Sequence, residues 1–262
     1  MARIRLDQLL VDRRLARSRA EAATLLMAGE VEVVGAGSRT LKPGLMLPAD
    51  TDLSVVARPR WASRGADKLA AALDAFGIDP TGLICLDAGA STGGFTDLLL
   101  ARGARTVYAI DVGRGQLLDR LARDPRVVSM ERTNLRTLDA LPEPIDLATL
   151  DLSFISLRLV LPAVRRLLAA RGSVVALVKP QFEAGRGAVP RGGVVRDPAT
   201  HREVLVRFGE DSAAAGFAPV ALVVSPIAGG DGNREFLALL RTEVIEPPAW
   251  EPLVDAVAPS AV

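Results

Sequence analysis

The sequence predicts an α/β protein in which a small N-terminal α+β domain precedes a doubly wound, mostly parallel sheet. From residue 83 onward, short apolar runs of strand length alternate with segments of helical periodicity, the pattern of a parallel sheet with helices on both faces. The first 56 residues instead contain two helical segments followed by short strands. With 262 residues, 49% of them hydrophobic, the chain is long enough for both domains.

The N-terminal domain is expected over residues 1–56, with helices over 5–15 and 18–28. Ser18 and Glu21 form a capping box for the second helix, and Gly29 is a suitable C-cap. Residues 1–60 hold ten Lys or Arg against seven Asp or Glu, and six of the ten are arginines in the first nineteen residues. Because arginine makes bidentate contacts with phosphate, this charge indicates a nucleic-acid surface, with an ordinary solvated surface as the alternative.

A linker is expected over 57–67, because this segment fits neither helical nor strand periodicity. It contains Trp61 between Arg60 and Arg64, so contact with RNA and docking between the domains are equally good interpretations. The helix that follows starts at Lys68, a cation at the positive end of a helix, which suggests a function for this side chain.

The second domain is expected over 68–245, followed by a disordered, proline-containing tail over 246–262. Its expected strands are 83–87, 106–111, 126–129, 145–151, 173–179 and 219–225. Its expected helices are 68–76, 95–102, 115–123, 157–170, 198–215 and 233–241.

A glycine-rich turn connects the first strand of this sheet to a helix. It reads D-x-G-x-x-x-G-G-F-T and begins at Asp87, with Gly89, Ser91 and Gly93 inside it. It lacks the Gly-Lys-Ser/Thr of a phosphate loop and the spacing of a dinucleotide fingerprint. The next strand ends in Asp111, about twenty residues on, where such folds place a ribose-binding carboxylate. A nucleoside ligand without a phosphate loop suggests S-adenosylmethionine; the alternative is that the glycines only allow tight packing and Asp111 only caps a turn.

Three charged residues are expected at the sheet edge where α/β folds bind ligands. Asp151 closes the strand 145–150, Lys179 closes the strand 173–178, and Glu235 was expected at a helix start. Burial disfavours the charged form of a lysine, so Lys179 could act as a base while Asp151 holds it and opposes that effect. The alternative is a structural ion-pair network.

Composition excludes several classes of protein. One cysteine, Cys85, rules out a disulfide framework and fits a packed small hydrophobe. No apolar run reaches about eighteen residues and the N-terminus lacks a signal-peptide core, so we expect a cytoplasmic protein without a membrane span. We expect no metal.

Residues 1–55 resemble the S4 RNA-binding domain in the run 5–13, the Ser18-Arg19 pair, Gly29-Glu30-Val31 and Lys42-Pro43-Gly44. The resemblance implies that structured RNA contacts Arg3, Arg5, Arg17, Arg19 and Lys42. It departs from the family at Val34-Gly35, where an asparagine usually precedes the glycine, so the geometry of that turn is open.

Residues from about 3 to 241 resemble the TlyA (hemolysin A) family, which joins an S4 domain to an FtsJ-like methyltransferase domain. The matching segments are 61–69, 86–95, 111–117, 131–134, 151–156, 178–183 and 232–236. The resemblance implies a Rossmann-like S-adenosylmethionine-dependent methyltransferase that methylates the ribose 2′-oxygen of cytidines in ribosomal RNA.

The same resemblance implies roles for individual residues. Lys68, Asp151, Lys179 and Glu235 would form the catalytic tetrad. Asp87, Gly89, Ser91 and Gly93 would lie at the methionine end of the cofactor, Asp111 at its ribose and Asn134 near its adenine, while Arg64 would contact RNA. A catalytically inactive ribosome-associated factor and a membrane-damaging protein remain the alternatives.

Overall fold

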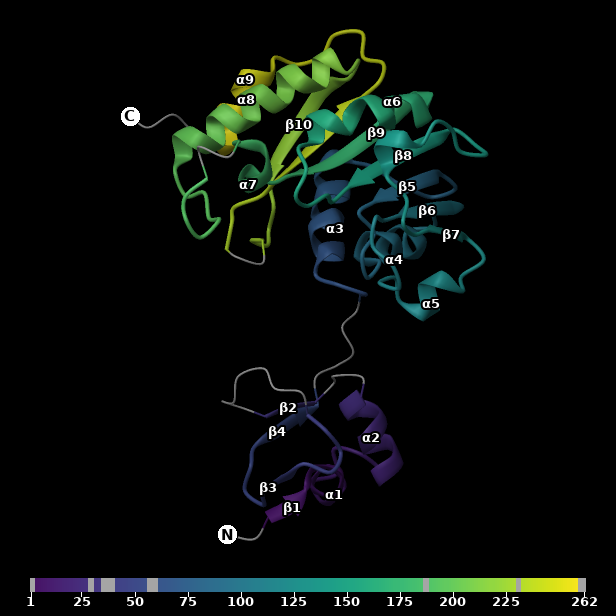
Figure 1. Cartoon of the computed structure of the whole chain (residues 1–262), viewed down its shortest axis with the longest axis vertical. Helices are drawn as coiled ribbons and strands as arrows, with labels where there is room; N and C mark the ends of the chain where they lie inside the picture. The colour runs from purple at the N-terminus through teal and green to yellow at the C-terminus, as the bar shows by residue number, and fades with distance from the viewer. Residues whose placement is uncertain are drawn as a thin grey trace. The chain divides into compact units, whose positions relative to one another are not determined.

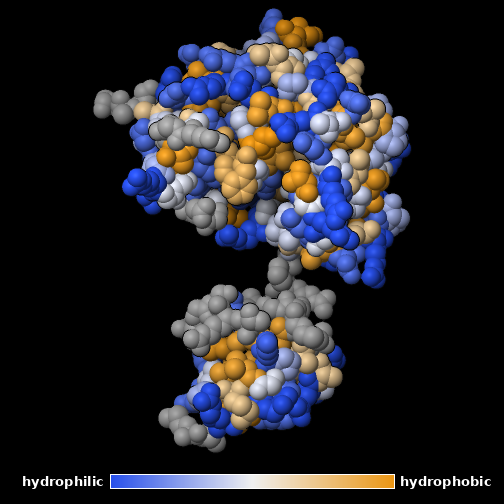
Figure 2. All heavy atoms as spheres, in the orientation of Figure 1, coloured by the Kyte–Doolittle hydropathy of each residue, from blue (hydrophilic) through white to orange (hydrophobic). Residues whose placement is uncertain are grey.

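The computed structural model describes residues 3–27, 31–33, 41–55, 61–185, 189–229 and 232–258. The chain divides into two compact units, Met1–Arg60 and Trp61–Val262, which are described separately (Figure 1). The division falls inside the linker expected over 57–67. Polar side chains cover most of the visible face of each unit, with apolar residues scattered among them (Figure 2).

The N-terminal unit combines two helices with two short antiparallel strand pairs. Its elements are β1 (Arg3–Arg5), α1 (Leu6–Asp12), α2 (Arg19–Met27), β2 (Val31–Val33), β3 (Met46–Pro48) and β4 (Leu53–Val55). β1 pairs with β3, and β2 pairs with β4. Leu6, Leu9 and Leu10 of α1 pack with Leu26 and Leu53 in a small core, as their helical spacing predicts. The predicted Gly29 cap and the Val34-Gly35 turn lie outside the described residues.

The larger unit is built on a seven-stranded sheet in the order β10-β11-β9-β8-β5-β6-β7. The strands are β5 (Ile84–Ala88), β6 (Thr106–Ile110), β7 (Val127–Met130), β8 (Ile145–Leu150), β9 (Leu168–Val178), β10 (Ala218–Val224) and β11 (Phe236–Arg241). β5 to β9 pair in parallel, whereas β11 is antiparallel to both of its neighbours. The predicted α/β class with a mostly parallel sheet is confirmed.

Helices cover both faces of this sheet (Figure 1). On one face α3 (Gly65–Phe76) and α4 (Gly94–Ala101) pack against it; on the other lie α6 (Leu161–Leu167), α8 (Pro198–Ala214) and α9 (Trp250–Val257). Successive residues of β9 alternate between the two cores: Val174 and Ala176 face the α6 side, and Val175 and Leu177 face the α3 side. Burial on both faces explains the unbroken apolar runs of the central strands.

The prediction of a helix over 233–241 is wrong, because this segment contains the strand β11. Its apolar run 236–240 suits a buried helix or a buried strand equally well, and periodicity alone does not separate them. Pairing with β9 and β10, with both faces covered, makes it a strand. Since β11 runs antiparallel to β9, its start lies at the edge where the parallel strands end. Glu235 therefore lies at the expected edge of the sheet, but it directly precedes the strand β11 and does not stand at the start of a helix.

Several predicted helix boundaries also change. The expected helix over 115–123 is reduced to α5 (Asp119–Ala122). The expected helix over 157–170 divides into a 3-10 turn, η2 (Leu157–Leu159), and α6, after which β9 starts at Leu168. The expected linker is wrong from residue 65 onward, because α3 starts at Gly65, whose N–H donates to Ser63 Oγ at 3.2 Å.

The predicted disorder of the tail is also wrong for residues 250–257, which form α9. Trp250 Nε1 donates to the Leu205 carbonyl oxygen at 2.8 Å, and Val254 is fully buried. Gly209 leaves the space that the indole ring occupies, since a Cβ there would collide with the ring. An apolar face on α9 thus orders a segment whose prolines suggested disorder.

We expect Trp250→Ala to lower the free energy of unfolding by roughly 2–3 kcal/mol, somewhat below the loss typical of a fully buried ring, because this ring is only partly buried. Chemical denaturation measures the change. Glu251→Ala, an exposed position on the same helix, is the matched control. Equal stability of the two variants would show that α9 does not support the fold.

Candidate functional site

The glycine-rich turn between β5 and α4 passes very close to the end of β8. Gly89 has φ +85°, and a Cβ there would collide with the Asp151 carbonyl oxygen, so only glycine fits. Ser91 also adopts a positive φ, +47°, and its N–H donates to Asp111 Oδ2 at 2.8 Å. This hydrogen bond stabilises the left-handed backbone conformation of Ser91. Unfavourable backbone conformations of this kind are common at ligand sites.

Asp87 lies under the turn, fully buried at the end of β5. Its Oδ2 accepts the backbone N–H of Thr96 at 2.8 Å and the hydroxyl of Thr96 at 2.6 Å. Burial raises the pKa of Asp87 to about 7, and the nearby Asp151 and Asp111 carboxylates add to the rise, whereas the Thr96 bonds oppose it. Its Oδ1 is buried without a hydrogen-bond partner among the described residues. Such an acceptor is suited to a ligand that donates hydrogen bonds.

Two cavities adjoin this turn and share Gly89, Ser91 and Asp151. The first, of about 250 Å³, is also lined by Lys68, Asp87, Thr92 and Arg64. The second, of about 350 Å³, is lined by polar residues that include Asp111 and Asn134 and by apolar side chains that include Ile110, Leu135, Phe154 and Val160. Gly93 lines neither cavity; its φ of +97° starts α4 with the Leu117 and Leu121 side chains packed against it.

The two residues predicted for the nucleoside already hold the local backbone. The Asp111 carboxylate accepts hydrogen bonds from the backbone N–H of Ser91 and, at 2.7 Å, from that of Gly113. Asp111 therefore does cap a turn, as the alternative interpretation expected. Asn134 Oδ1 accepts the Arg136 N–H at 3.1 Å and caps the short helix η1 (Leu135–Thr137). Each carboxylate oxygen has a second lone pair and the asparagine has an amide donor, so both side chains retain capacity for a ligand in the second cavity.

The predicted tetrad consists of two lysine–carboxylate pairs at the edge where the parallel strands end. Lys68 Nζ of α3 lies 2.5 Å from Glu235 Oε2, at the start of β11. Lys179 Nζ lies 2.7 Å from Asp151 Oδ1, and it donates to Ser153 Oγ at 3.1 Å. Lys179 is 9% exposed and Glu235 is 3% exposed, so the charges are partly withdrawn from water. Lys68 and Asp151 also line the first cavity, which brings both pairs to the ligand site.

The predicted RNA-binding residues are divided between the two units. Arg3, Arg5, Arg17, Arg19 and Lys42 belong to the N-terminal unit, whereas Arg64 lies in the larger unit at the first cavity. Several of the arginines are already paired: Arg5 and Arg19 with Asp7, and Arg17 with Glu21. Sequence reasoning treated these arginines as free cations and missed their carboxylate partners.

Sequence reasoning also missed Phe154, which is 91% exposed and has φ +63°. It lines the second cavity, and its ring centroid lies 5.1 Å from that of Phe182. A phenylalanine four residues after the end of a buried strand suggests core packing by composition alone. The nearby serines, Ser153 before Phe154 and Ser156 two residues after it, were the only signal that Phe154 lies in a loop.

The described residues contain neither a cluster of metal ligands nor a helix suited to cross a membrane. No group of three or more His, Cys, Asp or Glu side chains is placed to hold a metal ion within the described part of the chain. Likewise, no helix among the residues described has the length and apolar character to cross a bilayer.

The chain is similar to proteins of known name over nearly its full length. Residues 61–242 match the FtsJ-like methyltransferase family. The 16S/23S rRNA (cytidine-2′-O)-methyltransferase TlyA of Mycobacterium tuberculosis is 46% identical over 97% of this chain and 96% of its own. YqxC of Bacillus subtilis, which is named "Putative rRNA methyltransferase", is 49% identical over 89% of this chain and 84% of its own.

The solved structure of a protein described as a hemolysin, from Streptococcus thermophilus, covers 98% of this chain and 96% of its own, with 41% identity and a TM-score of 0.72. The match to the methyltransferase family covers the glycine-rich turn, both cavities and the tetrad. Methyl transfer with S-adenosylmethionine, predicted from the sequence, is thereby confirmed. This chain belongs to the FtsJ-like methyltransferase family.

Proposed function

We propose that this protein methylates the ribose 2′-oxygen of cytidines in ribosomal RNA. The observation that carries the proposal is the pair of lysine–carboxylate contacts, Lys179–Asp151 and Lys68–Glu235, beside a cavity suited to S-adenosylmethionine. The names of the TlyA and YqxC relatives support ribosomal RNA as the substrate. The complete turn and both ion pairs favour an enzyme over a catalytically inactive binding factor.

The residues around the two cavities fit the cofactor. S-adenosylmethionine is cationic at its ammonium and sulfonium, and Asp87, Asp111 and Asp151 supply carboxylate oxygens at the two cavities that can meet these groups. The unpaired Asp87 Oδ1 suits the ammonium, which lacks any acceptor of its own. Asp111 would accept the ribose hydroxyls, and Asn134 would lie beside the adenine in the second cavity.

Lys179 would hold the target hydroxyl and receive its proton. S-adenosylmethionine supplies a methyl group on a sulfonium, a strong leaving group, so positioning of the oxygen is the main requirement. Asp151 and Ser153 fix Nζ of Lys179 at one point, and a neutral amine there can accept the proton as the oxygen bonds to the methyl carbon. Lys68, held by Glu235, places a second cation at the same cavity.

The N-terminal unit would act as an S4-type RNA-binding domain. Among its described elements the helices α1 and α2 precede the short strands β2, β3 and β4, the helix-then-strand order expected of that domain, and the unit is basic. Arg3, Arg17 and Lys42 would contribute contacts with phosphate, and Arg64 would contact RNA beside the cavity of the larger unit.

The direct test is to incubate the protein with methyl-labelled S-adenosylmethionine and, separately, 30S subunits, 50S subunits and free ribosomal RNA. We expect label in RNA from at least one substrate. Absence of transfer to every substrate, while the cofactor is bound, would contradict the enzyme and favour the inactive factor.

Lys179→Ala should reduce methyl transfer by at least about 100-fold, since it removes the group that positions the hydroxyl and takes its proton. S-adenosylmethionine affinity should stay within about twofold, because Nζ is engaged by Asp151 and Ser153. Single-turnover transfer and calorimetry measure the two quantities. The matched control is Arg171→Ala, an exposed position of β9 far from its Lys179 end. Loss of cofactor binding in Lys179→Ala would contradict the assigned role.

Asp87 gives a pH dependence of cofactor binding. Its pKa in the free protein is about 7, and an ammonium bound to Oδ1 favours the ionised carboxylate. Affinity should therefore rise with pH up to about 7, level off above it, and be accompanied by proton release near neutrality. Calorimetry in buffers of different ionisation enthalpy measures that release. Asp87→Asn should bind more weakly and lose this pH dependence; a dependence that persists in the variant belongs to another group.

A further inference from the structure

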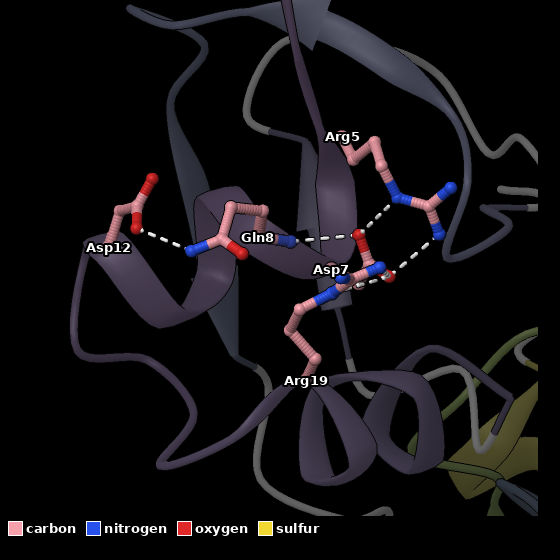
Figure 3. A network of polar contacts seen from close by, with 5 residues as sticks. All are labelled: Arg5, Asp7, Gln8, Asp12 and Arg19. Atoms are coloured by element: carbon pink, nitrogen blue, oxygen red, sulfur yellow. Dashed lines mark hydrogen bonds and ion pairs between the residues drawn. The ribbon is translucent and has the colours of Figure 1, made fainter.

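A buried aspartate in the N-terminal unit holds two exposed arginines side by side (Figure 3). Asp7 lies in the first turn of α1 and is 4% exposed. The side chains of Arg5 and Arg19, which approach it from β1 and α2, are 48% and 54% exposed. Three elements, β1, α1 and α2, thus bring two guanidinium groups to one carboxylate.

Each arginine meets Asp7 through two nitrogen atoms. Arg5 donates from Nε to Oδ1 at 3.0 Å and from Nη2 to Oδ2 at 2.9 Å, a bidentate pair. Arg19 donates from Nε and Nη2 to Oδ2 at 3.3 and 2.9 Å. The backbone N–H of Gln8 donates to Oδ1 at 2.9 Å and fixes the carboxylate itself. Both arginine forks therefore have a defined orientation.

The cluster is cationic. Hydrogen bonding from Arg5 holds the pKa of Asp7 well below its usual range, with Arg19 acting in the same direction and burial opposing both. Asp7 is consequently ionised at neutral pH and neutralises only one of the two guanidinium charges. A surface of this unit thus keeps a net positive charge where both arginines emerge.

The exposed parts of the two arginines retain hydrogen-bond donors. A guanidinium has five N–H groups, and the bonds to Asp7 use two from each arginine. The remaining N–H groups lie on side chains that are about half exposed. Orienting an arginine before binding reduces the conformational entropy lost when it meets a phosphate.

We propose that Asp7 positions Arg5 and Arg19 as a paired clamp for phosphate oxygens of folded RNA. The inference rests on the proposed function, because ribosomal RNA supplies the phosphates. Arg17 differs from the clamp: its side chain is 92% exposed and it pairs with Glu21 on the surface, an arrangement that fixes a side chain only weakly.

For the variant Asp7→Asn, the clamp and the net charge predict opposite changes in the affinity for RNA. Asp7→Asn removes a negative charge from a basic unit, and by long-range attraction alone the variant would bind a polyanion more tightly. An asparagine, however, accepts with one side-chain oxygen only and turns an amide donor toward the second guanidinium. Because the forks lose their fixed orientation, the clamp requires weaker binding.

The test compares Asp7→Asn with Asp12→Asn in the full chain. Asp12 is exposed on the same helix and, within the described part of the chain, accepts from Gln8 Nε2, and its variant makes the same change of charge. Affinity for the ribosomal subunit or rRNA that binds wild type is measured from low to high salt. We expect Asp7→Asn to weaken binding about tenfold and to flatten the salt dependence, and Asp12→Asn to bind as tightly as wild type or slightly more tightly.

A second pair of variants leaves Asp7 in place, so the fold is retained even if Asp7→Asn unfolds the unit. Arg19→Lys keeps the charge but replaces the planar fork with a single ammonium, and we expect about a fivefold loss of affinity. Arg13→Lys, at an exposed arginine that donates to the Ala49 carbonyl oxygen, is the control and should bind as wild type does. Thermal unfolding of each variant checks the fold.

Two results would overturn the clamp while leaving the proposed function intact: Asp7→Asn folded and binding as tightly as Asp12→Asn, or Arg19→Lys binding as tightly as Arg13→Lys, with wild type still methylating rRNA. If wild type binds S-adenosylmethionine but neither binds nor methylates any rRNA, the proposed function fails and the clamp fails with it.

Discussion

The close approach of the glycine-rich turn to the end of β8 is the constraint on which the site depends. The Asp151 N–H donates to the Ala88 carbonyl oxygen at 3.0 Å, and the Gly89 N–H donates to the Ile110 carbonyl oxygen at 2.8 Å. The turn is thus tied to the ends of both neighbouring strands. This arrangement brings the carboxylates of Asp87, Asp111 and Asp151 around adjoining cavities. Burial, with a smaller contribution from the Asp151 and Asp111 charges, raises the pKa of Asp87, and the carboxylates favour a cationic ligand.

Charged groups serve different purposes in the two units. Lys179 and Glu235 are nearly buried, each with a single opposite charge beside it, and such pairs contribute little net stability because burial removes hydration. The position of these ion pairs beside a cavity, rather than a contribution to stability, explains why charged residues occur there. In the N-terminal unit Asp7 is buried while its arginines stay exposed, which keeps their free donors available to a partner.

Much of the fold follows from the sequence, because apolar runs of strand length such as 145–150 alternate with segments of helical periodicity, and this alternation predicts a parallel sheet. The site residues at strand ends, Asp87 and Asp151, follow from the same pattern. The sequence did not reveal β11, since five consecutive apolar residues fit a helix equally well and only pairing with β9 decides. It did not reveal that Asp7 binds both Arg5 and Arg19 either, because the Arg19 contact joins residues on different helices and the Arg5 contact, two residues apart, follows no helical periodicity.

The position of the transferred methyl group tests the central claim most directly. After reaction with the RNA substrate, nucleosides released by enzymatic digestion are separated and identified by mass spectrometry. The account predicts 2′-O-methylcytidine, because Lys179, fixed by Asp151, is placed to hold a ribose hydroxyl at the cofactor cavity. A methyl group found only on a base would contradict the account, since the two lysine–carboxylate pairs would then act on a different nucleophile.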